Sequence, residues 1–116
     1  TNTGVLVSEI PYKNGEATGL AKLFNEQTGK LEYETNVING LRNGLSKEYY
    51  PSGKLANEVN FKNDIEDGIT KIYYESGKLK GEVAYKNGQL DGLAKIYDEN
   101  GKLVEQATYK DGQKIK

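Results

Sequence analysis

Glycine-bearing turns recur along this chain at a constant step of 24 residues. One series consists of Gly29, Gly53, Gly77 and Gly101, and a second consists of Gly40, Asp64, Gly88 and Gly112. The copies that they define are residues 19–43, 44–67, 68–91 and 92–116, preceded by a half copy at 5–18. A fixed period of this length is typical of repeat proteins, in which each copy contacts only its neighbours. The sequence therefore predicts one domain, residues 1–116, organised as a single repeat array.

Each copy has the pattern of a β-hairpin. Tyr, Val, Ile and Leu lie on both sides of the turns, and no helical period is sustained. The turn in "YYESGKL" has two readings: a two-residue loop sets Tyr74 opposite Leu79, and a three-residue loop sets Tyr73 there. Pro51 of the preceding copy favours the longer loop, because it then falls at the first central position of a type I turn. We expect the three-residue loop, with its glycine in the left-handed conformation, and a similar turn at Gly88.

Regular alternation along these strands would gather the large side chains on one face of the sheet. The four expected columns are Phe24, Tyr49, Tyr73, Tyr97; Leu31, Leu55, Leu79, Leu103; Leu20, Leu45, Ile69, Leu93; and Val37, Phe61, Tyr85, Tyr109. The lysines of the same face, which we expect to lift their ammonium groups to solvent or to a carboxylate, are Lys22, Lys47, Lys71 and Lys95. The opposite face is expected to carry Glu9, Glu34, Glu58, Glu82 and Gln106.

The composition suits a thin sheet. Hydrophobic residues make up 35% of the 116 residues and the mean hydropathy is -0.76, too little apolar material for a thick two-layer core. One copy buries too few side chains to offset its own ordering, so neighbouring copies have to complete it. We therefore predict an all-β fold: a single-layer antiparallel meander of tandem hairpins, forming a twisted or curled open sheet.

Several function classes are excluded by composition. The chain has no His and no Cys, so the usual general base, thiolate catalysis and the commonest zinc ligands are absent. Its acidic residues occupy equivalent places in successive copies, whereas paired-carboxylate hydrolysis needs two acids in unlike environments. The acidic segment "NDIED" lacks the spacing of a calcium loop. We predict a protein that is not an enzyme, with no catalytic residues, no cofactor and no metal site.

The net charge, the length of the apolar runs and the absence of Met limit the partners and the compartment that we expect. Sixteen Lys and Arg against seventeen Asp and Glu give a net charge of -1, which provides no basic face for nucleic acid or anionic lipid. No apolar run approaches a membrane span. We expect a soluble protein, cytoplasmic or exported. The absence of Met leads us to expect that the sequence begins after a processed or engineered N-terminus.

The copy "GITKIYYESGKLKGEVAYKNGQLDG" resembles the MORN repeat in its variant bacterial form, found in YwqK-like antitoxins. The resemblance is carried by Gly68, Tyr73, Tyr74, Gly77, Lys78, Leu79, Glu82, Tyr85, Asn87, Gly88 and Gly92, and extends over residues 5–113. It departs from the pattern at Asn25, Val37, Asp64 and Asp98. The resemblance implies a single-layer scaffold that binds a protein partner.

Tyrosine supplies a large apolar area with a hydroxyl that can stay hydrated, which suits a binding surface. The candidate interaction surface is Phe24, Tyr49, Tyr50, Tyr73, Tyr74, Tyr85, Tyr97 and Tyr109. The expected function is a scaffold that binds another protein, a second copy of itself included, through the aromatic face or an unpaired edge. The alternative is a carbohydrate- or cell-wall-binding module, although such repeats normally display Trp and this chain has none.

Overall fold

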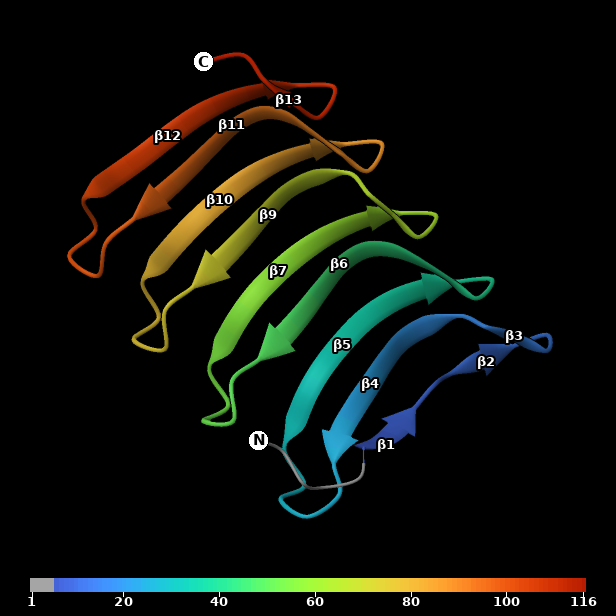
Figure 1. Cartoon of the computed structure of the whole chain (residues 1–116). Helices are drawn as coiled ribbons and strands as arrows, with labels where there is room; N and C mark the ends of the chain where they lie inside the picture. The colour runs from blue at the N-terminus through green and yellow to red at the C-terminus, as the bar shows by residue number, and fades with distance from the viewer. Residues whose placement is uncertain (1–5) are drawn as a thin grey trace.

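A computed structural model describes residues 6–116, and every element in it is a β-strand (Figure 1). The strands are β1 (Leu6–Glu9), β2 (Tyr12–Lys13), β3 (Glu16–Ala17), β4 (Gly19–Asn25), β5 (Leu31–Ile38), β6 (Leu41–Tyr49), β7 (Leu55–Lys62), β8 (Ile65–Glu66), β9 (Gly68–Tyr73), β10 (Leu79–Lys86), β11 (Gln89–Tyr97), β12 (Leu103–Lys110) and β13 (Gln113–Lys114). The half copy expected at 5–18 starts one residue outside the described part of the chain.

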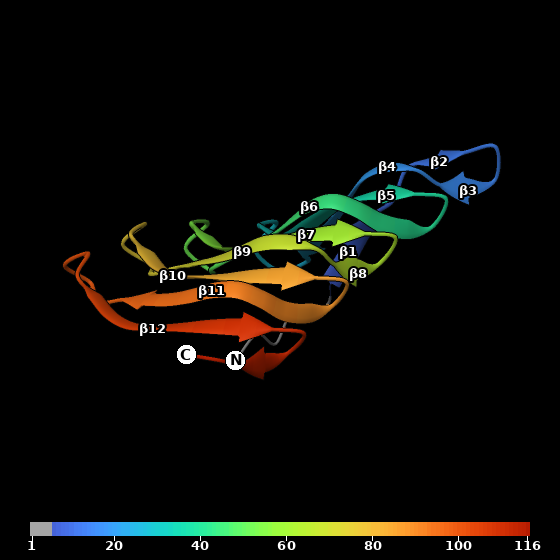
Figure 2. The same cartoon turned by 90° about the horizontal axis from the view of Figure 1, so that it is seen from above.

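The strands form one antiparallel meander. Their order is β1-β4-β5-β6-β7-β9-β10-β11-β12-β13, with β8 paired to β7 and with β2 and β3 in a small separate sheet. Figure 2 shows the sheet from above as a single twisted layer, and the extents of the protein are 46 × 31 × 18 Å. The predicted fold class, an open all-β meander of hairpin repeats with a period of about 24 residues, is confirmed.

Three of the four turns at one edge of the sheet have the predicted three-residue loop, and the first, between β4 and β5, has one residue more. Tyr73 pairs with Leu79, the Tyr74 amide donates to the Lys78 carbonyl, and the Gly77 amide closes the turn on the Tyr74 carbonyl. Gly77 has a φ of 94°, in the region that favours glycine. The same bonds surround Pro51, so the prediction based on proline geometry is confirmed.

The turns at the other edge differ from the prediction. Lys86 pairs directly with Gln89, which leaves a two-residue loop, Asn87–Gly88, with φ of 51° and 82°. Two positive φ values in a two-residue hairpin loop define a type I′ turn, which Asn-Gly favours. The expectation of a second three-residue loop was therefore wrong. Asp64, at the place of Gly88, has a φ of 69°, which shows that aspartate occupies this position.

A β-bulge in each copy overturns the prediction that all four columns share one face. In β10 the register moves from Leu79 opposite Tyr73 to Gly81 opposite Ile72, so Lys80 is an extra residue. An extra residue reverses the alternation of everything after it. Beyond the bulge, Tyr85 pairs with Gly68, an odd number of residues from Tyr73 on β9, and it therefore projects from the opposite side of the sheet.

The bulge also moves the glutamates. Glu82 pairs with both Lys71 and Lys95, and the same cross-strand pairing joins Glu34 to Lys47. The glutamates expected on the far face therefore lie on the face of Tyr73, among the lysines. On the other face lie Val37, Phe61, Tyr85 and Tyr109, paired with Gly19, Gly44, Gly68 and Gly92. Three of the four predicted columns share a face, and the fourth was placed on the wrong one.

Successive copies are connected beyond the strand ladder. At the type I′ edge, the amides of Asp64, Gly88 and Gly112 donate to backbone carbonyls of the preceding turn region at 2.8–2.9 Å. The amide of Asn63 also donates to the Asn43 side chain at 2.9 Å, and that of Asn87 to Asp67 at 3.3 Å. These contacts are repeated at the copy period, so each copy is completed by its neighbours.

Candidate functional site on the sheet faces

One face carries a row of alternating charges, which we call the ladder face. The row consists of Glu9, Lys22, Glu34, Lys47, Glu58, Lys71, Glu82, Lys95 and Gln106, one residue from each neighbouring strand from β1 to β12. Glu34, Glu58 and Glu82 each stand between two lysines, because the first strand of every copy supplies Lys and the second strand supplies Glu in every copy but the last, which has Gln106. Cross-strand neighbours of opposite charge stabilise the sheet, each by about 0.2–1 kcal/mol.

Tyrosine hydroxyls hold two of the glutamates. Tyr49 donates to Glu34 at 2.6 Å, and Tyr73 donates to Glu58 at 2.8 Å. Burial, followed by these hydrogen bonds, raises the pKa of Tyr49 and of Tyr73 to about 12. The two carboxylates are thereby held in position on the face, next to the aromatic row.

These raised values predict a loss of stability in alkali. An unfolded tyrosine ionises at a pKa of about 10, so the stabilisation from Tyr49 and Tyr73 is complete below that pH and is lost as the pH rises toward about 12. Urea unfolding at about pH 8 and about pH 11 should show a lower midpoint at the higher pH. A Tyr49→Phe, Tyr73→Phe variant should show a smaller difference between the two conditions. An equal difference would contradict the assignment.

Apolar side chains flank the charged row on the ladder face. Leu20, Ile69 and Leu93 belong to the row nearest the type I′ edge, and they are exposed to 41%, 44% and 43%. Between Ile69 and Leu93, over Ala84, the face is hollowed by a pocket of about 280 Å³. Large and small residues alternate along this row, because Leu20, Leu45 and Ile69 pair with Asn36, Asn60 and Ala84.

The opposite face has a floor of small residues, and we call it the trough face. The floor consists of Ala21, Thr35, Ser46, Val59, Thr70, Val83, Ala94 and Ala107. Ser46 is 2% exposed, and its hydroxyl is hydrogen-bonded to that of Thr35. Above the floor, Arg42 lies 4.0 Å from the centre of the Phe61 ring and forms an ion pair with Asp64 at 2.8 Å. That hydrogen bond lowers the pKa of Asp64.

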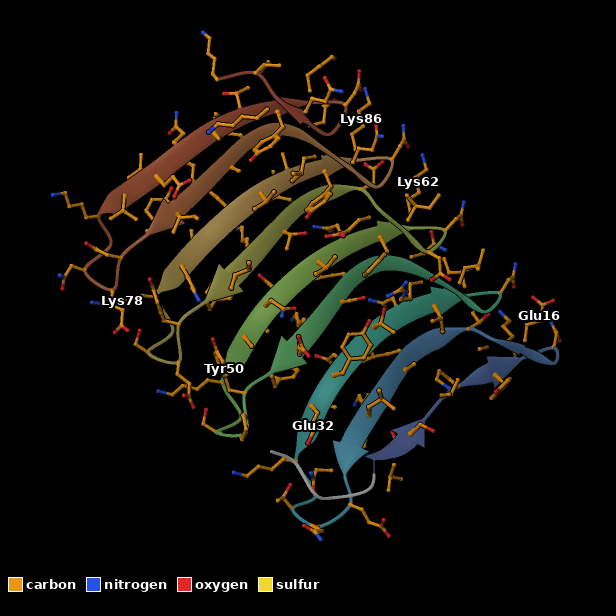
Figure 3. The ribbon with its side chains drawn as sticks, in the orientation of Figure 1. Glu16, Glu32, Tyr50, Lys62, Lys78 and Lys86 are labelled. Carbon is orange, nitrogen blue, oxygen red and sulfur yellow. The ribbon has the colours of Figure 1, made fainter. Side chains whose placement is uncertain are left out.

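Tyr50 and Tyr74 join neighbouring copies. The Tyr50 hydroxyl donates to the Tyr73 carbonyl at 2.5 Å, and the Tyr74 hydroxyl donates to the Tyr97 carbonyl at 2.8 Å. Lys80 lies 5.7 Å from the centre of the Tyr74 ring. Tyr50 lies at the edge formed by the three-residue turns, as Figure 3 shows. Both side chains therefore connect one copy to the next by a hydrogen bond.

Removal of one such hydroxyl should weaken the array. Tyr74→Phe is expected to lower the free energy of unfolding by about 1 kcal/mol, because the Tyr97 carbonyl loses a donor in a partly buried site. Urea denaturation followed by circular dichroism measures the change. Tyr12→Phe serves as the matched control, since Tyr12 is 68% exposed. Equal midpoints for the two variants would show that the hydroxyl of Tyr74 contributes nothing.

The structure divides the predicted interaction residues into three groups. Phe24, Tyr49, Tyr73 and Tyr97 form one row on the ladder face. Tyr85 and Tyr109 lie on the trough face over glycines. Tyr50 and Tyr74 lie between copies. Sequence reasoning missed the alternating row. Its signal was visible, a Lys in every first strand and a Glu in every second strand except the last, which has Gln106, but the two residue types were assigned to two faces.

The sequence matches the family described as "MORN repeat variant" in three tandem segments, residues 42–63, 66–87 and 90–111, which together cover more than half of the chain. The chain belongs to the MORN repeat variant family. These repeats are non-enzymatic modules that generally bind proteins or membranes, and the described residues contain no helix able to cross a bilayer. No curated protein matches the sequence significantly.

Two solved structures with a similar fold are those of TarM. One, described as the crystal structure of TarM, has a TM-score of 0.57 and 12% identity to this chain. The other is a variant of S. aureus TarM in complex with fondaparinux, alpha-GlcNAc-glycerol and UDP, with a TM-score of 0.58 and 11% identity. Each match covers 96% of this chain but 21% of TarM, so this MORN array spans about a fifth of the proteins that it resembles. At this identity the likeness concerns the fold alone.

Proposed function

We propose that this MORN array is a scaffold that binds another protein through its ladder face. The observation that carries the proposal is the exposure of large apolar side chains on a face that no second layer of the described chain covers. Leu20, Ile69 and Leu93 form one exposed row, and the aromatic row of Tyr49 and Tyr73 lies on the other side of the charges. Large apolar side chains exposed beside polar and charged ones are typical of protein-binding surfaces.

The ladder face suits a protein better than a small ligand. Its pocket of about 280 Å³ is lined by residues of β9, β10 and β11 alone, whereas the residues that recur from copy to copy extend the same chemistry across the whole sheet. A partner that spans several strands would meet apolar, charged and aromatic rows in parallel. The resemblance to YwqK-like antitoxins, whose name implies a protein partner, adds support for a protein as the occupant of this face.

Site-specific photo-crosslinking tests the face. A photo-reactive amino acid at position 93, on the ladder face, is expected to crosslink to a protein in lysate of the source organism. The same residue at position 72, where Ile72 is 38% exposed on the trough face, is the matched control and should give no such product. Crosslinks from position 72 alone, or from neither position, would overturn the proposal. Binding on a glycan array that ladder-face variants abolish would instead favour the carbohydrate-binding alternative.

A further inference from the structure

We propose that the partner of the ladder face is a second copy of this chain, bound face to face about a two-fold axis that runs parallel to the strands between β6 and β7. This inference rests on the proposed function, because it needs the same face. The inference adds which protein occupies the face and how the strands of the two copies align. The argument comes from the order of charges, the order of large and small residues, and the area of the face.

The order of charges selects the axis. An axis along the row would place each charge over its own copy, Lys47 over the partner's Lys47, and such like-charge contacts cost several kcal/mol. An axis parallel to the strands reverses the row instead. If that axis passes between β6 and β7, Lys47 meets the partner's Glu58, and Glu34 meets the partner's Lys71.

The same operation matches the remaining charges. Lys22 meets the partner's Glu82, and Glu9 meets the partner's Lys95. All eight charges of the row are thus opposed by charges of the other sign. Because both copies have the same spacing between strands, the opposite charges stay aligned from one end of the row to the other. A two-fold axis through a strand, rather than between strands, would oppose like charges throughout.

The apolar row fits the same register. Leu45 comes over the partner's Asn60, and Ile69 over the partner's Asn36, so large side chains meet smaller ones. Alternation of this kind lets two surfaces interdigitate. The 46 and 31 Å extents outline a face larger than the roughly 800 Å² that each partner of a standard interface buries.

The apolar and aromatic rows supply affinity in this dimer, and the charges supply register. Ion pairs removed from water gain little net stability, but a mispaired buried charge is costly. Because Tyr49 and Tyr73 already hold Glu34 and Glu58, less ordering remains to be done when the faces meet. A partner shifted by one strand loses every ion pair.

Charge reversal across the axis tests the inference. By sedimentation equilibrium the wild-type chain is expected to be a dimer, and Lys47→Glu and Glu58→Lys should each raise the dimer dissociation constant about tenfold or more. Each reversal creates two like-charge contacts. An equimolar mixture of the two variants should dimerise again, since every contact across the axis is then between opposite charges. The double variant should also dimerise. Glu48→Lys, which reverses a charge on the trough face, is the control and should leave the constant unchanged.

The outcomes separate this inference from the proposed function. A wild-type chain that stays monomeric up to millimolar concentration, or variants that do not recover on mixing, overturns the dimer. If such a chain still crosslinks a different protein from position 93, the scaffold function stands and only its occupant was wrong. Urea denaturation shows which variants remain folded, so that a loss of association is not mistaken for unfolding.

Discussion

Deletion of one complete copy is expected to leave a folded, shorter sheet, whereas deletion of half a copy is expected to unfold the protein. Removal of residues 68–91 joins Asp67 to Gly92, which recreates the Asp-Gly step found at 91–92. Lys95 then takes the place of Lys71 beside Glu58, so charges still alternate. The variant should unfold in one transition with an m-value lower by about a fifth, because m follows the surface exposed on unfolding.

The half-copy deletion, residues 80–91, breaks the pattern of the sheet. Residues 92–97 then follow Leu79 and have to serve as the second strand of the hairpin. Leu93 falls at the place of Gly81, which is buried and has no room assigned to a side chain in the wild-type sheet. Lys95 falls at the place of Val83, on the trough floor beside Thr70. A charge on the partly buried trough floor and an overfilled position are each destabilising.

Circular dichroism and urea denaturation of both deletions measure the difference. The 24-residue deletion is the matched control for the 12-residue one, since it removes more chain and preserves the register. Unfolding of the two variants at similar urea concentrations would show that stability does not depend on the 24-residue register. The sheet would then accept the first or the second strand of a copy at any place.

The turn geometry was predictable because it depends on local residue types. Pro51 fixes its own φ, and the glycine two residues later takes a conformation that other residues avoid. These two facts select the three-residue loop without knowledge of the rest of the sheet. The same reasoning correctly predicted the pairing of Tyr73 with Leu79 and the open meander that follows from it.

The bulge was not predictable in the same way. The extra residue is Lys80 in one copy, and the equivalent residues are Glu32, Ala56 and Val104, which share no chemistry. A period-two pattern therefore continues through the bulge with no visible mark. A weaker signal of the bulge was the glycine that recurs at the start of each copy. Each glycine stands opposite the column of Val37, Phe61, Tyr85 and Tyr109, which the bulge turns onto the trough face.

That pairing of a glycine with a large side chain leads to the second prediction. Gly68 has a φ of 121°, which residues with a side chain rarely adopt. A Cβ there would lie 3.1 Å from the Asn60 Cβ, and the Asn60 amide already donates to the Ile69 carbonyl at 3.0 Å. Gly68→Val adds backbone strain to this contact, and each effect costs about 1–3 kcal/mol. We expect the free energy of unfolding to fall by about 3 kcal/mol.

Urea denaturation with circular dichroism measures the loss, and Gly29→Asn is the control for it. Gly29 also has a positive φ, 72°, but nothing lies within 4 Å of its added Cβ, and asparagine adopts this conformation more readily than most residues. The control should therefore lose well under half as much stability as Gly68→Val. Because Gly68 pairs with Tyr85 and lies beside Asn60 of the preceding copy, its replacement should also weaken the contacts between copies. Similar midpoints for the two variants would show that the sheet accepts a side chain at Gly68, and with it a different path for the strand that carries Lys71 and Tyr73.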